Sequence, residues 1–125
     1  MRTARLGAVA AMGIAMVGLS IAPAYADGIT YSANGGASAG WVANGDRLDT
    51  CDEKKDGRAG VAKIWVKGQN PEYQGSDWAY GGAGTCLSIS RSWIPEGVTV
   101  RMQACLGNDY VIDESTCGPI RTDHS

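Results

Sequence analysis

The sequence predicts a small all-β domain, a disulfide-stapled antiparallel β-sandwich, and three observations lead to this fold class. Several short segments alternate apolar and polar side chains, as strands with one buried face do. Turn dipeptides separate them, and glycine makes up 15 of the 99 residues after position 26, about twice its average usage. No segment after position 26 has the i, i+3, i+4, i+7 apolar pattern of a helix. These features together favour a sandwich.

Residues 1–26 have the features of a secretory signal peptide. Two arginines lie near the N-terminus, and the chain then carries no charge until Asp27. Ala24-Tyr25-Ala26 is an A-x-A cleavage site. An uncleaved membrane helix is the alternative, but the apolar run is rich in Gly, Ala and Ser, and no basic cluster follows it. We therefore expect a secreted, extracellular protein with no membrane attachment after cleavage.

Cleavage leaves a single sandwich domain, residues 27–121, and a tail, residues 122–125, that we expect to be disordered. A core of this size is marginal by itself, so the four cysteines are expected to form two disulfides. Loss of the two signal-peptide arginines reduces the 11 basic side chains to nine, against 13 acidic ones. Nucleic-acid binding needs a concentrated basic face, so this balance argues against a nucleic-acid partner. We expect a monomer.

The first half of the domain contains the strongest local signals. A short β-prone lead-in at residues 27–36 precedes a strand at 37–43, and Asn44-Gly45 reverses the chain into a strand at 46–52. Asp56-Gly57 supplies a second turn, because this dipeptide tolerates positive φ.

The clearest strand is the segment 61–67. One of its faces is apolar and is assigned to the core, with Ala62, Ile64 and Val66. The opposite face places Trp65 between two lysines. The following segment, 68–84, shows no alternation and contains five glycines and a proline, so it predicts a long loop.

A hairpin is predicted between residues 86–93 and 98–104, joined by the turn at 95–97. Both segments alternate apolar and polar side chains, and a register that places Leu87 opposite Ala104 makes their apolar faces coincide. Two short extended segments complete the chain, residues 110–112 and 117–120.

Cysteine spacing alone leaves all three disulfide connectivities open. The hairpin register just described places Cys86 opposite Cys105, which would leave Cys51 to pair with Cys117.

Several turn and cysteine motifs resemble those of a group of small secreted actinobacterial β-sandwich proteins that have two disulfides and no assigned function. The motifs are Gly45-Asp46, Cys51-Asp52, Asp56-Gly57, Glu96-Gly97 before Val98-x-Val100, and the two closing cysteines. The resemblance implies the pairs Cys51–Cys86 and Cys105–Cys117. It carries over no catalytic residue.

The sequence offers little for catalysis, and we expect no enzyme. His124 is the only histidine and lies near the C-terminus, while every cysteine is needed for pairing, so a Ser-His-Asp or Cys-His arrangement has no positioned base. A glycosidase would need two carboxylates across a cleft that so small a domain hardly provides. A small carboxylate-based hydrolase remains an alternative.

Calcium is the one metal considered, with Asp49, Asp52 and Asp56 as its candidate ligands. An EF-hand loop starting at Asp52 fails, because lysines occupy its third and twelfth positions. The three aspartates could still converge in another geometry. The alternative is that they accept hydrogen bonds from turn amides, and no cofactor is otherwise expected.

Four aromatic residues are the candidate binding site: Tyr73, Trp78, Tyr80 and Trp65. Such rings stack on sugars or peptide side chains, whereas the alternative is that they cover the core as a lid. We therefore expect a secreted binding protein with a cell-surface, carbohydrate or protein partner. The second hypothesis is a protein inhibitor of an exported hydrolase that presents the loop 68–84 or 106–116 as a wedge.

Overall fold

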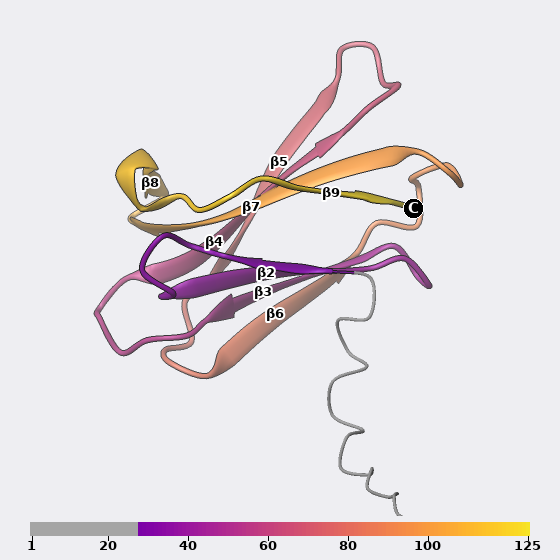
Figure 1. The fold of residues 1–125 in the computed structure, drawn as a ribbon. Helices are drawn as coiled ribbons and strands as arrows, with labels where there is room; N and C mark the ends of the chain where they lie inside the picture. The colour runs from indigo at the N-terminus through magenta and orange to yellow at the C-terminus, as the bar shows by residue number, and fades with distance from the viewer. Residues whose placement is uncertain (1–27) are drawn as a thin grey trace, which may run out of the picture.

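The computed structural model describes residues 28–125, which fold into two antiparallel β-sheets packed face to face (Figure 1). The first sheet has the strand order β1-β2-β3-β6. The second sheet has the order β5-β4-β7, and both β8 and β9 pair with β7. The predicted small all-β sandwich with two disulfides is therefore confirmed. The signal peptide predicted at residues 1–26 lies outside the described residues.

The elements follow one another along the chain as short strands with a single turn of 3₁₀ helix near the end. Their bounds are β1 Ile29–Tyr31, β2 Ala37–Val42, β3 Arg47–Asp52, β4 Ala59–Val66, β5 Tyr73–Ala79, β6 Thr85–Ser90, β7 Thr99–Asn108, β8 Val111–Asp113, η4 Glu114–Thr116 and β9 Arg121–His124. Within residues 28–125, no helix has the length and apolar character needed to cross a membrane.

The core lies between the two sheets and is formed by alternate residues of the central strands. Ala62, Ile64 and Val66 of β4 are fully buried, which confirms the core face predicted from their alternation. Trp41 of β2 and Met102 of β7 pack in the same cluster. A strand whose every second side chain is apolar and buried is fixed in register, because a slip by one residue would expose that whole set.

The turns around β3 form where the sequence predicted them. Gly45 has a φ of 107° in the β2–β3 hairpin, and Gly57 has a φ of 74° in the next turn. The second turn does not form a hairpin, because it carries the chain from the first sheet into the second. Gly60 is required at this crossing, since a Cβ there would lie 2.5 Å from the carbonyl oxygen of Cys51.

The prediction of a loop at residues 68–84 is wrong for the central part of this segment, which forms β5. This strand pairs with β4 from Tyr73 opposite Val66 to Ala79 opposite Gly60. Glycine and short polar residues conceal its alternation, but the backbone ladder with β4 satisfies its amides and carbonyls.

The prediction of a hairpin between residues 86–93 and 98–104 is also wrong. β6 pairs with β3 in the first sheet, and β7 pairs with β4 in the second. Leu87 lies opposite Thr50, and its side chain is 37% exposed because β6 is an edge strand with a neighbour on one side only. The matching alternation of the two segments therefore does not reflect direct pairing, and Leu87 and Ile89 of β6 lie outside the buried core cluster.

Two disulfides join Cys51 to Cys86 and Cys105 to Cys117, so the pairing implied by the resemblance is confirmed. The first links the neighbouring strands β3 and β6, where its cysteines are register partners. The alternative Cys86–Cys105 pair is excluded. Both bonds indicate that the chain folds in an oxidising environment.

The C-terminal residues 122–125 do not form the disordered tail that the sequence predicted. Residues 121–124 form β9, which pairs with β7 from Thr99 opposite His124 onwards. Trp41 donates its indole N–H to the carbonyl oxygen of His124 (3.1 Å), and the Ser125 N–H donates to the Val98 carbonyl oxygen. Backbone pairing therefore orders a polar segment that has no apolar pattern.

Candidate functional site

The candidate aromatic residues divide between the two faces of the second sheet. Tyr73 lies opposite the core residue Val66, so its ring is on the inner face, where it packs against Trp93 at 5.0 Å between centroids. Trp65 and Trp78 lie on the outer face, because they alternate with inward-facing residues along β4 and β5. Tyr73 therefore supports the core and is not part of an exposed site.

Three rings meet at one end of the outer face: Trp78, Tyr80 and Tyr110. We call these three residues the aromatic platform. Trp78 and Tyr80 are nearly parallel, with centroids 5.9 Å apart. Tyr110 lies 5.3 Å from Trp78 and 5.4 Å from Tyr80. Tyr80 is 51% exposed and Tyr110 is 74% exposed. Two of the three rings therefore present aromatic surface to solvent.

Tyr110 is the member of the platform that sequence reasoning missed. It occupies the two-residue turn between β7 and β8, where Asp109 has a φ of 50° and Tyr110 a φ of 62°. A bulky residue in this left-handed region is uncommon and costs free energy, and Asn-Gly is the usual choice in such turns. The sequence analysis assigned residue 110 to a short extended segment, and nothing in the sequence indicated that a tyrosine would adopt this conformation.

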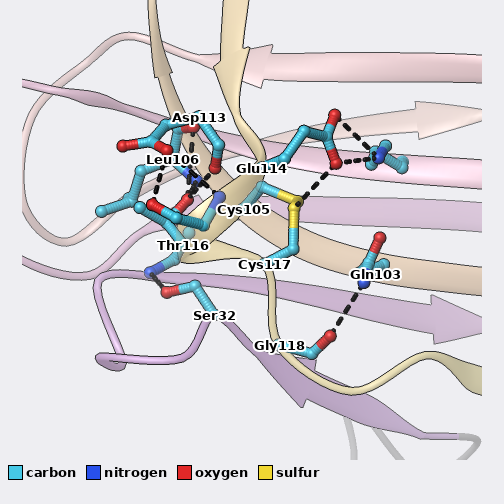
Figure 2. Close-up of a disulfide and its surroundings, with 12 residues drawn as sticks. Ser32, Gln103, Cys105, Leu106, Asp113, Glu114, Thr116, Cys117 and Gly118 are labelled. Atoms are coloured by element: carbon cyan, nitrogen blue, oxygen red, sulfur yellow. Dashed lines mark hydrogen bonds and ion pairs between the residues drawn. A yellow bond between two sulfur atoms is a disulfide. The ribbon is translucent and has the colours of Figure 1, made fainter.

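The turn belongs to an arch, residues 109–118, which is fastened to the second sheet. The disulfide between Cys105 and Cys117 closes it (Figure 2). The Thr116 hydroxyl accepts a hydrogen bond from the Leu106 N–H (2.8 Å) and donates one to the Asp113 carbonyl oxygen (2.6 Å). These bonds hold the arch, and with it Tyr110, in one position.

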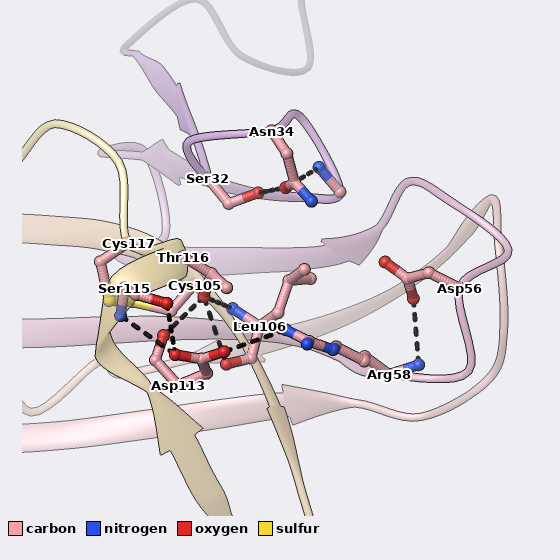
Figure 3. Close-up of polar contacts among 11 residues, drawn as sticks. Ser32, Asn34, Asp56, Arg58, Cys105, Leu106, Asp113, Ser115, Thr116 and Cys117 are labelled. Carbon is pink, nitrogen blue, oxygen red and sulfur yellow. Dashed lines mark hydrogen bonds and ion pairs between the residues drawn. A yellow bond between two sulfur atoms is a disulfide. The ribbon is translucent and has the colours of Figure 1, made fainter.

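Two ion pairs connect the arch with β4 and the turn before it. Arg58 extends from that turn to the Asp113 carboxylate, with 3.2 Å between Nη1 and Oδ2 (Figure 3). Hydrogen bonds from Ser115 are the main cause that lowers the pKa of Asp113, and Arg58 adds to the effect. Lys63 pairs with Glu114 at 2.9 Å. Both pairs are partly exposed, so they orient the arch more than they stabilise it.

The platform is seated directly on the sheet because Gly107 of β7 has no side chain. A Cβ at this position would lie 2.7 Å from the Trp78 ring. Desolvation is the main cause that raises the pKa of Tyr80 above its ordinary value, and the neighbouring Tyr110 adds to it.

Trp65 forms a second aromatic position on the same face. Its ring has the Lys63 ammonium at 5.6 Å and the Arg101 guanidinium at 5.5 Å from the centroid. A shallow cavity of about 220 Å³ lies beside it, lined in part by Gln74 and Ser76. Trp65 lies opposite Gln74, four residues before Trp78, which separates the two tryptophans by about 13 Å along the strands.

A larger cavity of about 430 Å³ adjoins the platform at Tyr80. We call it the charged cavity, because acidic and basic residues line it: Asp52, Lys54, Lys55, Asp56, Arg58 and Asp109. Asp52 is the most buried of them, with 3% of its surface exposed. Burial is the main cause that raises the pKa of Asp52, and the neighbouring acids Asp56 and Glu53 add to it.

The structure separates the three aspartates considered as calcium ligands. Asp49 accepts two hydrogen bonds from Arg47, whereas Asp52 lies on the other face of β3. Asp56 accepts the Arg58 N–H within its turn, as the alternative interpretation predicted. In the part of the chain from residue 28 to 125, no group of three His, Cys, Asp or Glu side chains could hold a metal ion. The three aspartates therefore do not converge as the calcium alternative requires.

The aromatic platform, Trp65 and the charged cavity together form the candidate binding surface, which comprises the second sheet, its arch and the turn that follows β3. Of the four aromatic residues proposed from the sequence, the structure places Trp78, Tyr80 and Trp65 on this surface and Tyr73 on the inner face, and it adds Tyr110. No family model, curated protein or solved structure matches this chain, so the binding surface is interpreted from its own geometry.

Proposed function

We propose that this chain is a secreted binding protein, not an enzyme, and that it recognises carbohydrate through the aromatic platform. The observation that carries this proposal is the convergence of three rings, two of them more than half exposed, from β5, the residue that follows it and the arch. Tyrosine and tryptophan rings give a large apolar contact at a low cost in conformational entropy, and sugar rings stack on them through their C–H faces.

The surroundings of the platform favour carbohydrate over a protein partner. Gln74 and Ser76 are on the outer face of β5, Gln74 at the level of Trp65 and Ser76 between that level and Trp78. The Trp78 indole donates to the Ser76 hydroxyl at 3.2 Å. Short polar side chains between two aromatic positions suit a chain of sugar hydroxyls. The centre of a protein interface is usually more apolar. The span of about 13 Å between the tryptophans suits an oligosaccharide better than a single sugar.

The test is binding of the purified protein to a panel of soluble oligosaccharides and insoluble cell-wall polysaccharides. Trp78→Ala should reduce affinity about 5- to 150-fold for any glycan that the wild type binds, because a ring stacked on a ligand contributes roughly 1–3 kcal/mol in comparable stacking sites. Tyr31→Ala is the matched control, since Tyr31 is 48% exposed on β1 of the other sheet. Equal affinity of the Trp78 variant and the control would reject the platform as the site.

A second candidate function is inhibition of an exported hydrolase. One observation favours it: Tyr110 stands 74% exposed at the tip of an arch closed by the Cys105–Cys117 disulfide, as an inhibitory wedge requires. The segment 68–84 suits this role less well, because its central part is the strand β5 and not a protruding loop. Stoichiometric loss of activity in a hydrolase secreted by the same cells, relieved by Tyr110→Ala, would support inhibition in place of glycan binding.

Secretion is part of the same proposal. The charge-free segment before residue 27, its A-x-A site and the two disulfides are its support. N-terminal sequencing of the protein from culture medium should begin at Asp27. Recovery of the intact N-terminus in the membrane fraction would contradict cleavage.

A further inference from the structure

Three carboxylates line the charged cavity: Asp52, Asp56 and Asp109. None of them forms an ion pair with a basic side chain among residues 28–125. Two of the basic residues in its lining are engaged elsewhere. Lys54 donates to the carbonyl oxygen of Asn34, and Arg58 pairs with Asp113. The Asn34 carbonyl is neutral, so Lys54 keeps its charge, and within the described lining two lysines, Lys54 and Lys55, face three unpaired acids. The cavity therefore has a small excess of negative charge.

Asp52 gives the strongest indication that a ligand belongs in this cavity. Its side chain is almost completely buried, and its Oδ1 atom has no hydrogen-bond partner within the described chain. The Lys54 backbone N–H donates to the carboxyl group, which leaves the second oxygen unsatisfied. A buried acceptor without a donor is rare in folded proteins because it carries an unrecovered desolvation cost. A ligand with a charged N–H donor would remove that cost.

Tyr80 connects the charged cavity with the aromatic platform, since it belongs to the platform and also lines the cavity. One ligand can therefore stack on the platform and extend a substituent toward Asp52. The chemistry required of that substituent is a compact cation with several N–H donors, which a primary ammonium group provides.

We propose that the charged cavity receives the primary ammonium group of an amino sugar whose oligosaccharide chain lies on the aromatic platform. This rests on the proposed function, because it specifies which class of carbohydrate the platform binds. In the complex, the ammonium group donates to Asp52 Oδ1 and is attracted by Asp56 and Asp109 at the cavity mouth.

The test uses two probes that differ only at the amino group: a β-1,4-linked glucosamine tetrasaccharide and its fully N-acetylated counterpart. Calorimetric titration of the wild type at pH 6, where the free amines are protonated, should show about tenfold tighter binding of the glucosamine form, as expected for a charge-assisted contact. Equal affinity for both probes would overturn the amine site while leaving the platform intact. Failure of both probes to bind would overturn both proposals.

Two variants test whether the preference for the free amine arises in the charged cavity. Asp52→Asn should bring the affinity ratio of the two probes close to one. Asp109→Asn should reduce that ratio about threefold, and asparagine tolerates the left-handed conformation found there. Because Asp109 is exposed, this second variant remains informative if the first one fails to fold.

Glu96→Gln is the matched control, because it removes one exposed negative charge from the turn before β7, outside the cavity. It should leave the ratio unchanged. An equal decrease of the affinity ratio in this control would show that only the net charge of the protein attracts the amine. Tighter binding of a lysine-containing peptide than of the glucosamine tetrasaccharide would also overturn the proposal.

Discussion

Tyr73 and Trp78 lie on the same strand, yet their rings face opposite sides of the second sheet. The inner group around Tyr73 is fully paired: Trp93 packs on its ring, and Arg91 is held by Asp77 through two hydrogen bonds of 2.7 and 2.9 Å. This group has its polar partners within the chain and supports the core.

The outer group combines the platform with the charged cavity, and its interactions are incomplete. Two of its rings are at least half exposed, and Asp52 is buried without a cation from residues 28–125 beside it. The aromatic residues of one short segment therefore take two different roles according to the face of the sheet on which they lie. Stability should therefore depend on the inner group and recognition on the outer one.

The largest expected effect on stability comes from the variant Asp77→Ala, which breaks the buried ion pair between Asp77 and Arg91. Arg91 and Asp77 are both more than nine-tenths buried, so the variant leaves a buried guanidinium without its acid. We expect the free energy of unfolding to fall by roughly 3–5 kcal/mol, measured by urea denaturation. Asp123→Ala breaks the more exposed pair with Arg121 and should cost less than about 1 kcal/mol. Similar losses in both variants would contradict the role of the inner pair.

The next effect concerns the arch, which connects the outer group with the fold. Replacing Cys105 and Cys117 together by serine should lower the free energy of unfolding by about 3 kcal/mol, because the bond closes a loop with a sequence separation of 12. The affinity for a platform ligand should also fall, since Tyr110 is no longer held. Serines at Cys51 and Cys86 serve as the control: stability should fall there too, but the affinity of the folded protein should not.

A smaller effect on stability is expected from replacing Asp52, and it should be a gain and not a loss. Burial raises its pKa above the ordinary 3.8, so the folded protein binds this proton more tightly than the unfolded chain does. Its ionisation therefore destabilises the fold as the pH rises through the window between 3.8 and the raised value. Asp52→Asn should increase the melting temperature at pH 7, and the gain should disappear below about pH 3.8.

Asp49→Asn is the matched comparison for this measurement, because the Asp49 carboxylate is paired with Arg47. The variant should be no more stable than the wild type at pH 7. A decrease in the melting temperature for Asp52→Asn would show that the fold stabilises the charge of Asp52, which is the opposite of the burial effect.

The parts of the fold that the sequence predicted correctly depend on local chemistry. The core face of β4 follows from the alternation of Ala62, Ile64 and Val66, and the β2–β3 hairpin follows from Asn44-Gly45. Each of these signals lies within one strand or one turn, so no knowledge of distant partners is required.

The errors arise where distant pairing decides the structure. β5 contains glycine and short polar residues, and only its ladder with β4 makes it a strand. β6 and β7 have matching apolar faces, but each pairs with a different neighbour, which an alternation pattern cannot specify. The left-handed conformation of Tyr110 is imposed by the anchored arch.

The most direct test of the division between inner and outer groups compares Tyr73→Ala with the double variant Tyr80→Ala/Tyr110→Ala. We expect the Tyr73 variant to lose about 2 kcal/mol of stability and to keep its glycan affinity, because its ring is partly buried against the core. The double variant removes two exposed rings, so its stability should change by less than about 1 kcal/mol while glycan binding is lost. The reverse result, a large loss of stability with unchanged binding in the double variant, would contradict the division of roles between the two faces.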